Sequence, residues 1–213
     1  MIIFDYNQVA ISNLMEQIGS SKVSVDETLV RHMILNTIRT YVKKYKDSHG
    51  PEVIIACDNR HYWRREIFPH YKAGRKKARD SSGHDWGSIF EVLGKIKQEL
   101  KDSSPYKVID VDTCEADDII AVLAMKYSST QKVMILSSDK DFAQLQKFPN
   151  VEQYSPILKK NIKEPLPAAQ LKQLIIRGDK SDGIPNILSK DDTFVEGARQ
   201  KPITEAKIIN WMN

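Results

Sequence analysis

The stretch VIDVDTCEADDIIAVLAMKYSSTQKVMILSSDKDFAQL, residues 108–145, decides the fold of this chain. Apolar runs at residues 106–111 and 133–136 have the composition of strands. The residues between them predict a helix with one apolar side, formed by Ile119, Ile120, Val122, Leu123 and Met125. We therefore expect a strand, a helix and a strand in succession, which is the repeating unit of an α/β domain.

Acidic side chains follow both of these strands. Glu115-Ala116-Asp117-Asp118 comes after the first strand and Ser138-Asp139-Lys140-Asp141 after the second, so five carboxylates fall within 27 residues. Function in parallel sheets collects beyond the carboxyl ends of the strands, and carboxylates held close together there favour a bound cation. Acids in the first turn of a helix are also ordinary caps, so Asp118 can be mainly a cap.

Two further strands end in an acid. Residues 2–4 lead to Asp5, and the apolar run at residues 53–57 leads to Asp58. Capping does not readily explain four strands that each deliver an acid at the same end, so the pattern favours a metal site. A later loop, Gly178-Asp179-Lys180-Ser181-Asp182, adds two more acids. The nine candidate metal ligands are Asp5, Asp58, Glu115, Asp117, Asp118, Asp139, Asp141, Asp179 and Asp182.

Helices and strands alternate along the rest of the chain. The apolar spacing predicts helices at residues 9–18, from the capping box of Ser24 and Glu27 to Gly50, from the cap Asp85 to about residue 102, at residues 167–177 and near residues 203–211. A last strand at residues 151–154 and an edge strand or hairpin at residues 157–162 are also expected. The predicted fold is an α/β core, residues 1–165, with a mostly parallel central sheet flanked by helices, followed by a small helical region, residues 166–213.

The segment at residues 60–84, called the basic segment below, differs sharply from its surroundings. Its first 20 residues hold eight basic residues and one acidic residue, a net charge of +7, interleaved with Tyr62, Trp63, Phe68 and Tyr71. Cations and stacking rings in this mixture are typical of a nucleic-acid contact. A solvated basic loop is the alternative. The segment leaves the strand that delivers Asp58, which favours a role beside the metal site.

Composition limits the function classes. The chain has 213 residues, 41% of them hydrophobic, no apolar run of transmembrane length and a net charge of +4, so we expect a cytoplasmic monomer without membrane contact. Neither Cys57 nor Cys114 has the spacing of a metal ligand, and the five histidines are scattered. Because the nine acids carry −9, the rest of the chain carries +13. A basic body around an acidic pocket suits phosphodiester hydrolysis.

Oxygen ligands indicate which metal is expected. Two ions about 3.5–4 Å apart, as in two-metal hydrolases, need mostly hard carboxylate oxygens. Such ligands favour Mg²⁺ over zinc, with Mn²⁺ as a substitute. The sequence therefore predicts a site for two Mg²⁺ ions.

Together these motifs resemble the 5′-nuclease (flap endonuclease) family in order and rough spacing over residues 1–185. Tyr71-Lys72-Ala73-Gly74-Arg75 is similar to the element at the base of that family's helical arch. Finer details at residues 62–65, 137–139 and 155–156 are most similar to a phage branch with ribonuclease H activity, whose 5′ to 3′ exonucleases remove RNA primers during DNA replication. The resemblance implies DNA and RNA–DNA hybrids with 5′ ends or flaps as substrates. The candidate protein partners are then a single-stranded DNA-binding protein and a replication clamp. The expected location is the cytoplasm of a host bacterium if a phage encodes the chain.

The resemblance also implies a role for each residue. One metal ion would be held by Asp5, Asp58, Glu115 and Asp117, the other by Asp117, Asp139, Asp141 and Asp182, with Asp118 and Asp179 acting through water or a second shell. Lys72 and Arg75 would contact the scissile phosphate and stabilise charge in the transition state. Tyr71 would stack on an unpaired base or anchor the arch. Further substrate contacts would come from Arg64, Arg65 and Lys76.

The chain departs from the family beyond residue 185. The region at residues 186–213 lacks the Gly-x-Gly turns of the family's helix-hairpin-helix, so it binds duplex DNA through a different loop or does not bind it. It also ends before the C-terminal helical region of the phage enzymes, as in a short form or a truncated chain. Two other functions stay open, a PIN-type endoribonuclease and a module that binds branched DNA without cutting it. A dehalogenase-type phosphatase has its aspartate pair on the first strand, followed two residues later by Thr. In this chain Asp110-Val111-Asp112 is not on the first strand, and residue 114 is Cys.

Overall fold

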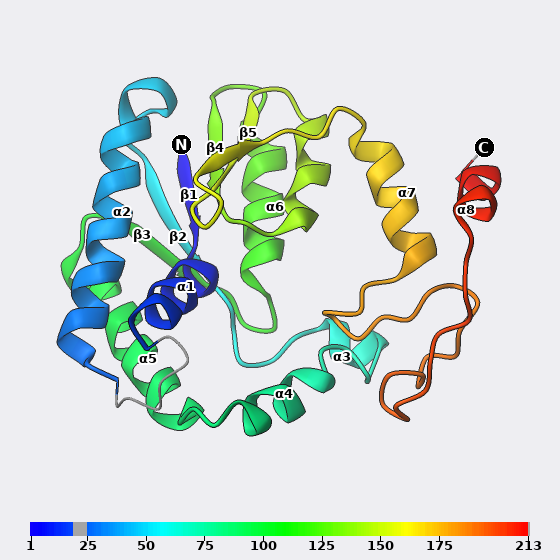
Figure 1. Ribbon diagram of the computed structural model, residues 1–213. Coiled ribbons are helices and arrows are strands. Elements are labelled where there is room, and N and C mark those ends of the chain that lie inside the picture. The colour runs from blue at the N-terminus through cyan, green and yellow to red at the C-terminus, as the bar shows by residue number, and fades with distance from the viewer. Residues whose placement is uncertain (19–24, 213) are drawn as a thin grey trace. The chain divides into compact units, whose positions relative to one another are not determined.

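The computed structural model describes residues 1–18 and 25–212 (Figure 1). By its contacts the chain divides into two compact units. The first comprises residues 1–61 and 85–164, and the second comprises residues 62–84 and 165–213. Contacts thus group most of the basic segment with the C-terminal residues, whereas the sequence-based division placed it in the core.

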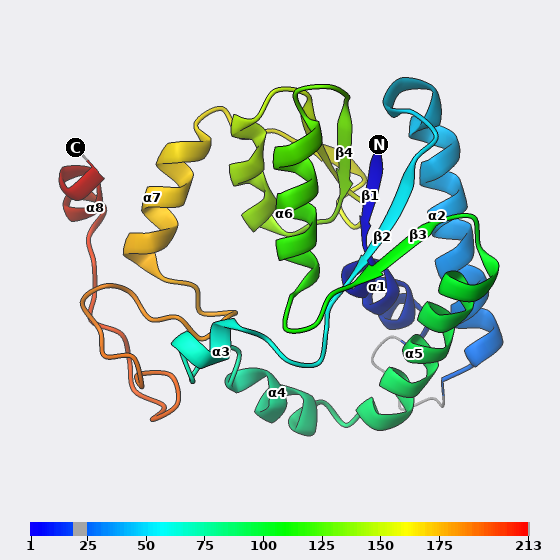
Figure 2. The same cartoon turned by 180° about the vertical axis from the view of Figure 1, so that it is seen from behind.

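The first unit is built on one six-stranded sheet. Its order is β3-β2-β1-β4-β5-β6, and all neighbouring strands are parallel except the antiparallel edge strand β6 (Figures 1 and 2). The strands are β1 (Ile2–Asp5), β2 (Val53–Cys57), β3 (Lys107–Asp110), β4 (Val133–Leu136), β5 (Val151–Ser155) and β6 (Lys160–Ile162). This sheet confirms the predicted α/β fold. The predicted strands are close in extent to β1, β2 and β4, whose residues are all buried, because buried parallel strands need continuous apolar runs.

Helices cover both faces of this sheet. Helices α1 (Tyr6–Ile18), α2 (Glu27–His49) and α5 (Trp86–Ser103) pack on one face, where Ile2, Phe4 and Ile55 lie in the core. Helix α6 (Ala116–Tyr127) and the 3-10 helix η1 (Lys140–Lys147) pack on the other, against Ile3 and Ile54. Side chains alternate between faces along a strand, so a fully apolar strand supplies both cores.

The helix N-caps agree with the sequence-based predictions only in part, and one helix was not predicted. Helix α2 begins at Glu27 with Asp26 as its N-cap, whose carboxylate accepts the Leu29 N–H at 3.0 Å. The predicted cap Ser24 lies outside the described residues. Asp85 caps α5 as predicted and accepts the Ser88 N–H. The 3-10 helix after the Asp139 loop was not predicted, because eight residues with mixed polarity give no strong helical period.

The second unit contains four helices among its described residues. They are α3 (Arg64–Ile67), α4 (Gly74–Ser82), α7 (Pro167–Arg177) and α8 (Glu205–Met212). Helix α7 ends at Gly178, and the loop that follows closes on itself through the Asp179–Ile184 bridge. Through the described ranges, no helix combines the length and the apolar character needed to span a membrane.

Candidate functional site

Four strand ends of the first unit bring acids to one edge of the sheet. Strands β3, β2, β1 and β4 are neighbours in this order. Asp5 ends β1 and Asp58 follows β2. Glu115 is the N-cap of the helix after β3, and the loop after β4 contains Asp139. Because the strands are parallel, their carboxyl ends lie at the same edge. The strand order thus places acids from four strands at the same edge of the sheet, and their joint role as metal ligands stays a prediction.

Asp5 is the most deeply perturbed of these acids. Its side chain is only 7% exposed, and burial, with the nearby charges of Asp58 and Asp139, raises its pKa to about 7. The Gln8 N–H at 3.1 Å and the Ser137 hydroxyl at 3.0 Å donate to its two oxygens and partly offset this rise. A carboxylate in such a position is costly to ionise unless a cation lies beside it.

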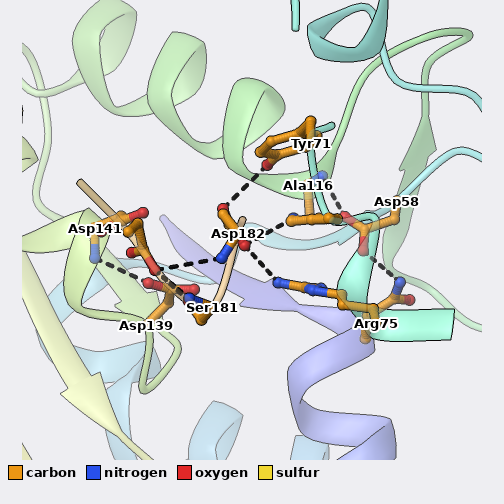
Figure 3. Close-up of polar contacts among 11 residues, drawn as sticks. Asp58, Tyr71, Arg75, Ala116, Asp139, Asp141, Ser181 and Asp182 are labelled. Carbon is orange, nitrogen blue, oxygen red and sulfur yellow. Dashed lines mark hydrogen bonds and ion pairs between the residues drawn. The ribbon is translucent and has the colours of Figure 1, made fainter. Parts of the chain in front are cut away.

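Asp58 is oriented by two donors from other elements. Its Oδ2 accepts the side-chain amide of Asn7 at 2.6 Å, and its Oδ1 accepts the Ala116 N–H at 2.8 Å (Figure 3). Asn7 lies in the first turn of α1, and Ala116 is the first residue of α6. Sequence reasoning missed Asn7, because an amide 51 residues from its partner leaves no local signal.

Glu115 and Asp118 form the capping box of α6. The Glu115 side chain accepts the Asp118 N–H, and the Asp118 carboxylate accepts the Glu115 N–H at 2.9 Å. The expected capping role of Asp118 is therefore confirmed. Glu115 is 1% exposed, and Asp117 lies in the same first turn. A carboxylate that caps a helix with one oxygen still has other lone pairs with which it can bind a metal ion. The metal-binding roles of these acids therefore stay predictions.

The loop after β4 holds the next two acids. Asp139 is the N-cap of η1, and its Oδ1 accepts the Asp141 N–H at 2.9 Å (Figure 3). The Asp139 N–H in turn donates to the Ser137 hydroxyl oxygen at 3.1 Å. Gln153 on β5 donates to two carbonyl oxygens of the same loop. Neither Ser137 nor Gln153 had been given a role from the sequence, since their partners are set by the folding of β4 and β5.

Asp179 and Asp182 belong to the second unit. The Asp179 carboxylate accepts the Ser181 N–H at 2.8 Å and the Ser181 hydroxyl at 2.5 Å, which fixes a tight turn. Asp182 accepts the Tyr71 hydroxyl at 3.2 Å and Arg75 Nη2 at 2.7 Å (Figure 3). The acidic loop therefore holds the basic segment within this unit.

Tyr71 and Lys72 are buried in the same contact. Tyr71 is 4% exposed and Lys72 8%, and Lys72 Nζ lies 3.9 Å from Asp182 Oδ1. Lys72 has a left-handed backbone, with φ of 55°, and its N–H donates to the Asp182 carbonyl at 2.8 Å. Non-glycine residues in this conformation cost energy and gather at functional sites. For Tyr71, this geometry favours anchoring over base stacking.

The remaining predicted substrate contacts lie on the basic segment, where Arg65 and Lys76 are exposed and Arg64 is half-buried. The Arg64 guanidinium carbon lies 4.7 Å from the Trp63 ring centroid, and that of Arg65 lies 5.2 Å from the Tyr62 ring centroid. Lys76 projects from α4, a helix with no buried residue. Guanidinium groups stacked on rings keep their N–H donors at the edge, where phosphates can be bound.

The acids of the first unit fit a divalent cation by their chemistry. Each offers hard carboxylate oxygens, the donors preferred by Mg²⁺ and Mn²⁺, and Asp5 is buried with two like charges nearby. Over residues 1–18 and 25–212, however, no three His, Cys, Asp or Glu side chains are already arranged as a metal shell. Their oxygens instead accept hydrogen bonds from N–H and O–H donors, as for Asp5, Asp58 and Asp139. Cation binding would therefore exchange some of these bonds.

The chain is similar in sequence to known nucleases. Residues 12–174 match the 5′-3′ exonuclease, N-terminal resolvase-like domain. The chain is 40% identical over 205 residues to the ribonuclease H of Enterobacteria phage T4, covering 92% of this chain and 67% of that protein. It is 31% identical over 137 residues to the flap endonuclease Xni of Vibrio vulnificus, 62% of this chain and 49% of that protein. It is 27% identical over 187 residues to the exonuclease of Escherichia phage T7, 85% of this chain and 58% of that protein.

Solved structures share the fold. The phage T5 D15 protein crystallised with metal ions superposes with a TM-score of 0.72 at 16% identity, covering 98% of this chain and 82% of that one. A phage T5 D15 flap endonuclease complex with DNA and metal ions gives a TM-score of 0.70 at 17% identity, covering 99% and 83%. The family match spans more than half of the chain, and the likeness to the T4 enzyme agrees with the predicted phage branch. This chain therefore belongs to the 5′-3′ exonuclease family of nucleases.

Proposed function

We propose that this chain is a metal-dependent 5′ nuclease that hydrolyses phosphodiester bonds at the 5′ ends or flaps of DNA and RNA–DNA hybrids, as in the removal of RNA primers. The proposal draws support from the 40% identity to the T4 ribonuclease H. The likeness to Xni, a flap endonuclease, also supports it. The chain spans about two thirds of the T4 protein and about half of Xni, so substrate and activity are part of the proposal.

The observation that carries the proposal is the burial of Asp5 beside Asp58 and Asp139. Three carboxylates from three neighbouring strands repel one another, and this repulsion adds to burial in raising the Asp5 pKa to about 7. A protein that served only to bind DNA would gain nothing from acids gathered at one sheet edge, since they repel phosphates. A site that binds divalent cations gains directly, because a cation restores the ionised form.

The acids of the first unit would hold Mg²⁺, with two ions as the expected number. The residues concerned are Asp5, Asp58, Glu115, Asp117, Asp139 and Asp141, with Asp118 mainly a cap. When bound, divalent ions neutralise a phosphate under attack and ease the ionisation of water. The protein's own part is to hold these carboxylates in place through Asn7, Ser137 and the α6 capping box.

The basic segment would supply the contacts to the nucleic acid. Lys72 and Arg75 would stabilise charge that develops on the phosphate, in the manner of fixed cations at a transition state. Both side chains pair with Asp182 in this structure. A phosphate would therefore compete with Asp182 for them. The exposed cations of α4, with Lys76 among them, would bind the backbone without reading its sequence.

Cleavage assays with 5′-labelled substrates test this function. We expect Mg²⁺ or Mn²⁺ to support release of short products from the 5′ end of a flap or an RNA–DNA hybrid, and EDTA to stop it. Asp139→Asn and Asp141→Asn should each abolish cutting while binding to the same substrate persists or strengthens, because a negative charge beside the phosphate is removed. Asp112→Asn serves as the matched control, since Asp112 is an exposed acid outside the predicted ligand set.

The outcomes separate the alternatives. Cleavage confined to single-stranded RNA, without dependence on a 5′ end, would identify a PIN-type endoribonuclease instead. Binding of branched DNA without cleavage under any divalent ion would identify a binding module. Activity that persists in EDTA would refute metal-dependent hydrolysis altogether.

A further inference from the structure

Gln153 occupies an unusual place for an amide. It is the third residue of β5 and is 1% exposed, after the exposed Glu152 and before the buried Tyr154. Apolar side chains normally fill such mid-strand positions, because a buried amide loses its hydrogen bonds to water. The side chain must therefore make contacts that compensate for this loss.

Both donor hydrogens of Gln153 are directed to one loop. Its Nε2 donates to the carbonyl oxygen of Ser137 at 3.0 Å and to that of Asp139 at 2.6 Å. The reverse orientation of the amide would place Oε1 against two carbonyl oxygens, so the chemistry fixes which end faces the loop. Within the described part of the chain, Oε1 has no hydrogen-bond partner. The contacts of Nε2 therefore set the position of this side chain.

The Ser137 and Asp139 carbonyl groups lie just beyond the last paired residues of the parallel strands β4 and β5. The β4–β5 pairing ends at Leu136 with Tyr154, and the Ser137 N–H still donates to the Tyr154 carbonyl at 3.2 Å. Past this point the main chain of β5 no longer pairs with the loop. The side chain of Gln153 extends the attachment to Asp139, and the Ser138 and Ser155 hydroxyls meet at 2.6 Å.

The same loop connects acids from two strands. The Ser137 hydroxyl donates to Asp5 Oδ2 at 3.0 Å and accepts the Asp139 N–H at 3.1 Å. Asp139 Oδ1 in turn accepts the Asp141 N–H at 2.9 Å. A shift of the Ser137 and Asp139 peptides would therefore move the surroundings of three predicted metal ligands at once.

We propose that Gln153 is a positioning residue that fastens the Ser137–Asp139 loop to β5 and thereby sets the affinity of the acid site for divalent ions. The inference rests on the proposed function, since it concerns the same carboxylates. Groups that orient metal ligands from behind typically change metal affinity or activity by about 10–100-fold when they are removed. Gln153 does not touch substrate or metal in this scheme, so its effect passes through the loop.

Variants of Gln153 separate this role from simple packing. Gln153→Glu replaces the amide nitrogen by an oxygen, so that at most one donor remains, while Gln153→Met keeps the length and removes all polarity. Gln146 is the control, because its Nε2 donates to the Ile162 carbonyl at 3.1 Å and its Oε1 accepts the Glu164 N–H at 2.9 Å, and neither partner belongs to the Ser137–Asp139 loop. Gln146→Met should lose comparable bonds without disturbing the acid loop. Ser137→Ala, a small change in the same hydrogen-bonded chain, provides a further variant if a Gln153 variant does not fold.

Two measurements on the full chain test the proposal. Calorimetric titration with Mn²⁺ alone should show a Kd at least about 10-fold higher for the Gln153 variants and for Ser137→Ala, and an unchanged Kd for Gln146→Met. In the metal-free protein, hydrogen exchange of the Asp139 and Asp141 amides should be faster in the Gln153 variants than in Gln146→Met. Ser137→Ala should also speed exchange of the Asp139 amide, because it removes the acceptor of that N–H. Wild-type Mn²⁺ affinity and exchange rates in the Gln153 variants would overturn this inference and leave the nuclease function standing. Failure of the wild-type chain to bind Mn²⁺ would overturn both.

Discussion

Replacing Asp5 by Asn should stabilise the metal-free protein at alkaline pH. The Asp5 carboxyl has a pKa of about 7 in the folded chain and an ordinary value of 3.8, so the folded state binds its proton more tightly than the unfolded state does. Stability therefore falls as pH rises from about 4 to about 7, and then levels off. At pH 8 the ionised Asp5 works against folding, whereas below pH 4 both states are protonated and the effect vanishes.

The size of the effect follows from the same pKa difference. A rise of about three pKa units corresponds to about 4 kcal/mol at most, at about 1.36 kcal/mol per unit. Asn offers one acceptor oxygen, and it cannot accept from both the Gln8 N–H and the Ser137 hydroxyl, which costs about 1–2 kcal/mol. We expect a net gain of about 2 kcal/mol, which for a chain of this size raises Tm by roughly 4–8 °C.

Thermal unfolding in EDTA at pH 5 and pH 8 measures this effect. The wild-type Tm should be lower at pH 8 than the Asp5→Asn Tm, and the gap should shrink toward pH 4. Mg²⁺ at pH 8 should raise the wild-type Tm and have much less effect on the variant, because binding to the folded state is what stabilises it. Asp47→Asn, at an exposed position on α2, controls for the loss of one charge. If Asp5→Asn lowers Tm at both pH values, the carboxylate supports the metal-free fold and the reasoning fails.

Three further predictions concern the second unit. Lys72→Ala should slow cleavage by about 10²-fold in single-turnover assays if Lys72 stabilises the transition state, and an unchanged rate would leave it a partner of Asp182 alone. Lys76→Ala should weaken DNA binding for every sequence and lower the slope of log K against log salt by about one, measured by fluorescence anisotropy; an unchanged slope would remove Lys76 from the contact. Gly178→Ala should destabilise the protein by about 3 kcal/mol in denaturant unfolding, because an added Cβ would lie 2.4 Å from the Ile184 carbonyl oxygen at a φ of 69°. Gly197→Ala, with the same φ and open space around it, should cost less, and an equal cost would refute the clash.

The strands, the order of the acids and the family could all be predicted from the amino-acid sequence. Continuous apolar runs such as residues 53–57 and 133–136 put apolar side chains on both faces of a strand, so both faces must be covered. This pattern identified parallel strands, whose two faces are covered by helices. Acids placed directly after such runs must reach one edge of the sheet. Asp85 and Gly178 were also readable as helix ends, because caps depend on neighbouring residues.

The hydrogen bonds that hold these acids could not be predicted from the sequence, because they join residues far apart in the chain. Asn7 contacts Asp58 across 51 residues, and the Ser137 hydroxyl contacts Asp5 across 132. The pairing of Asp182 with Arg75, 107 residues away, likewise has no local signature. Hydrogen bonds of this kind depend on which strands and loops become neighbours. The sequence does not show whether a given polar residue has a hydrogen-bond partner in the folded protein. The sequence thus identified the candidate carboxylates, and the positions of the donors that orient them follow from the tertiary structure.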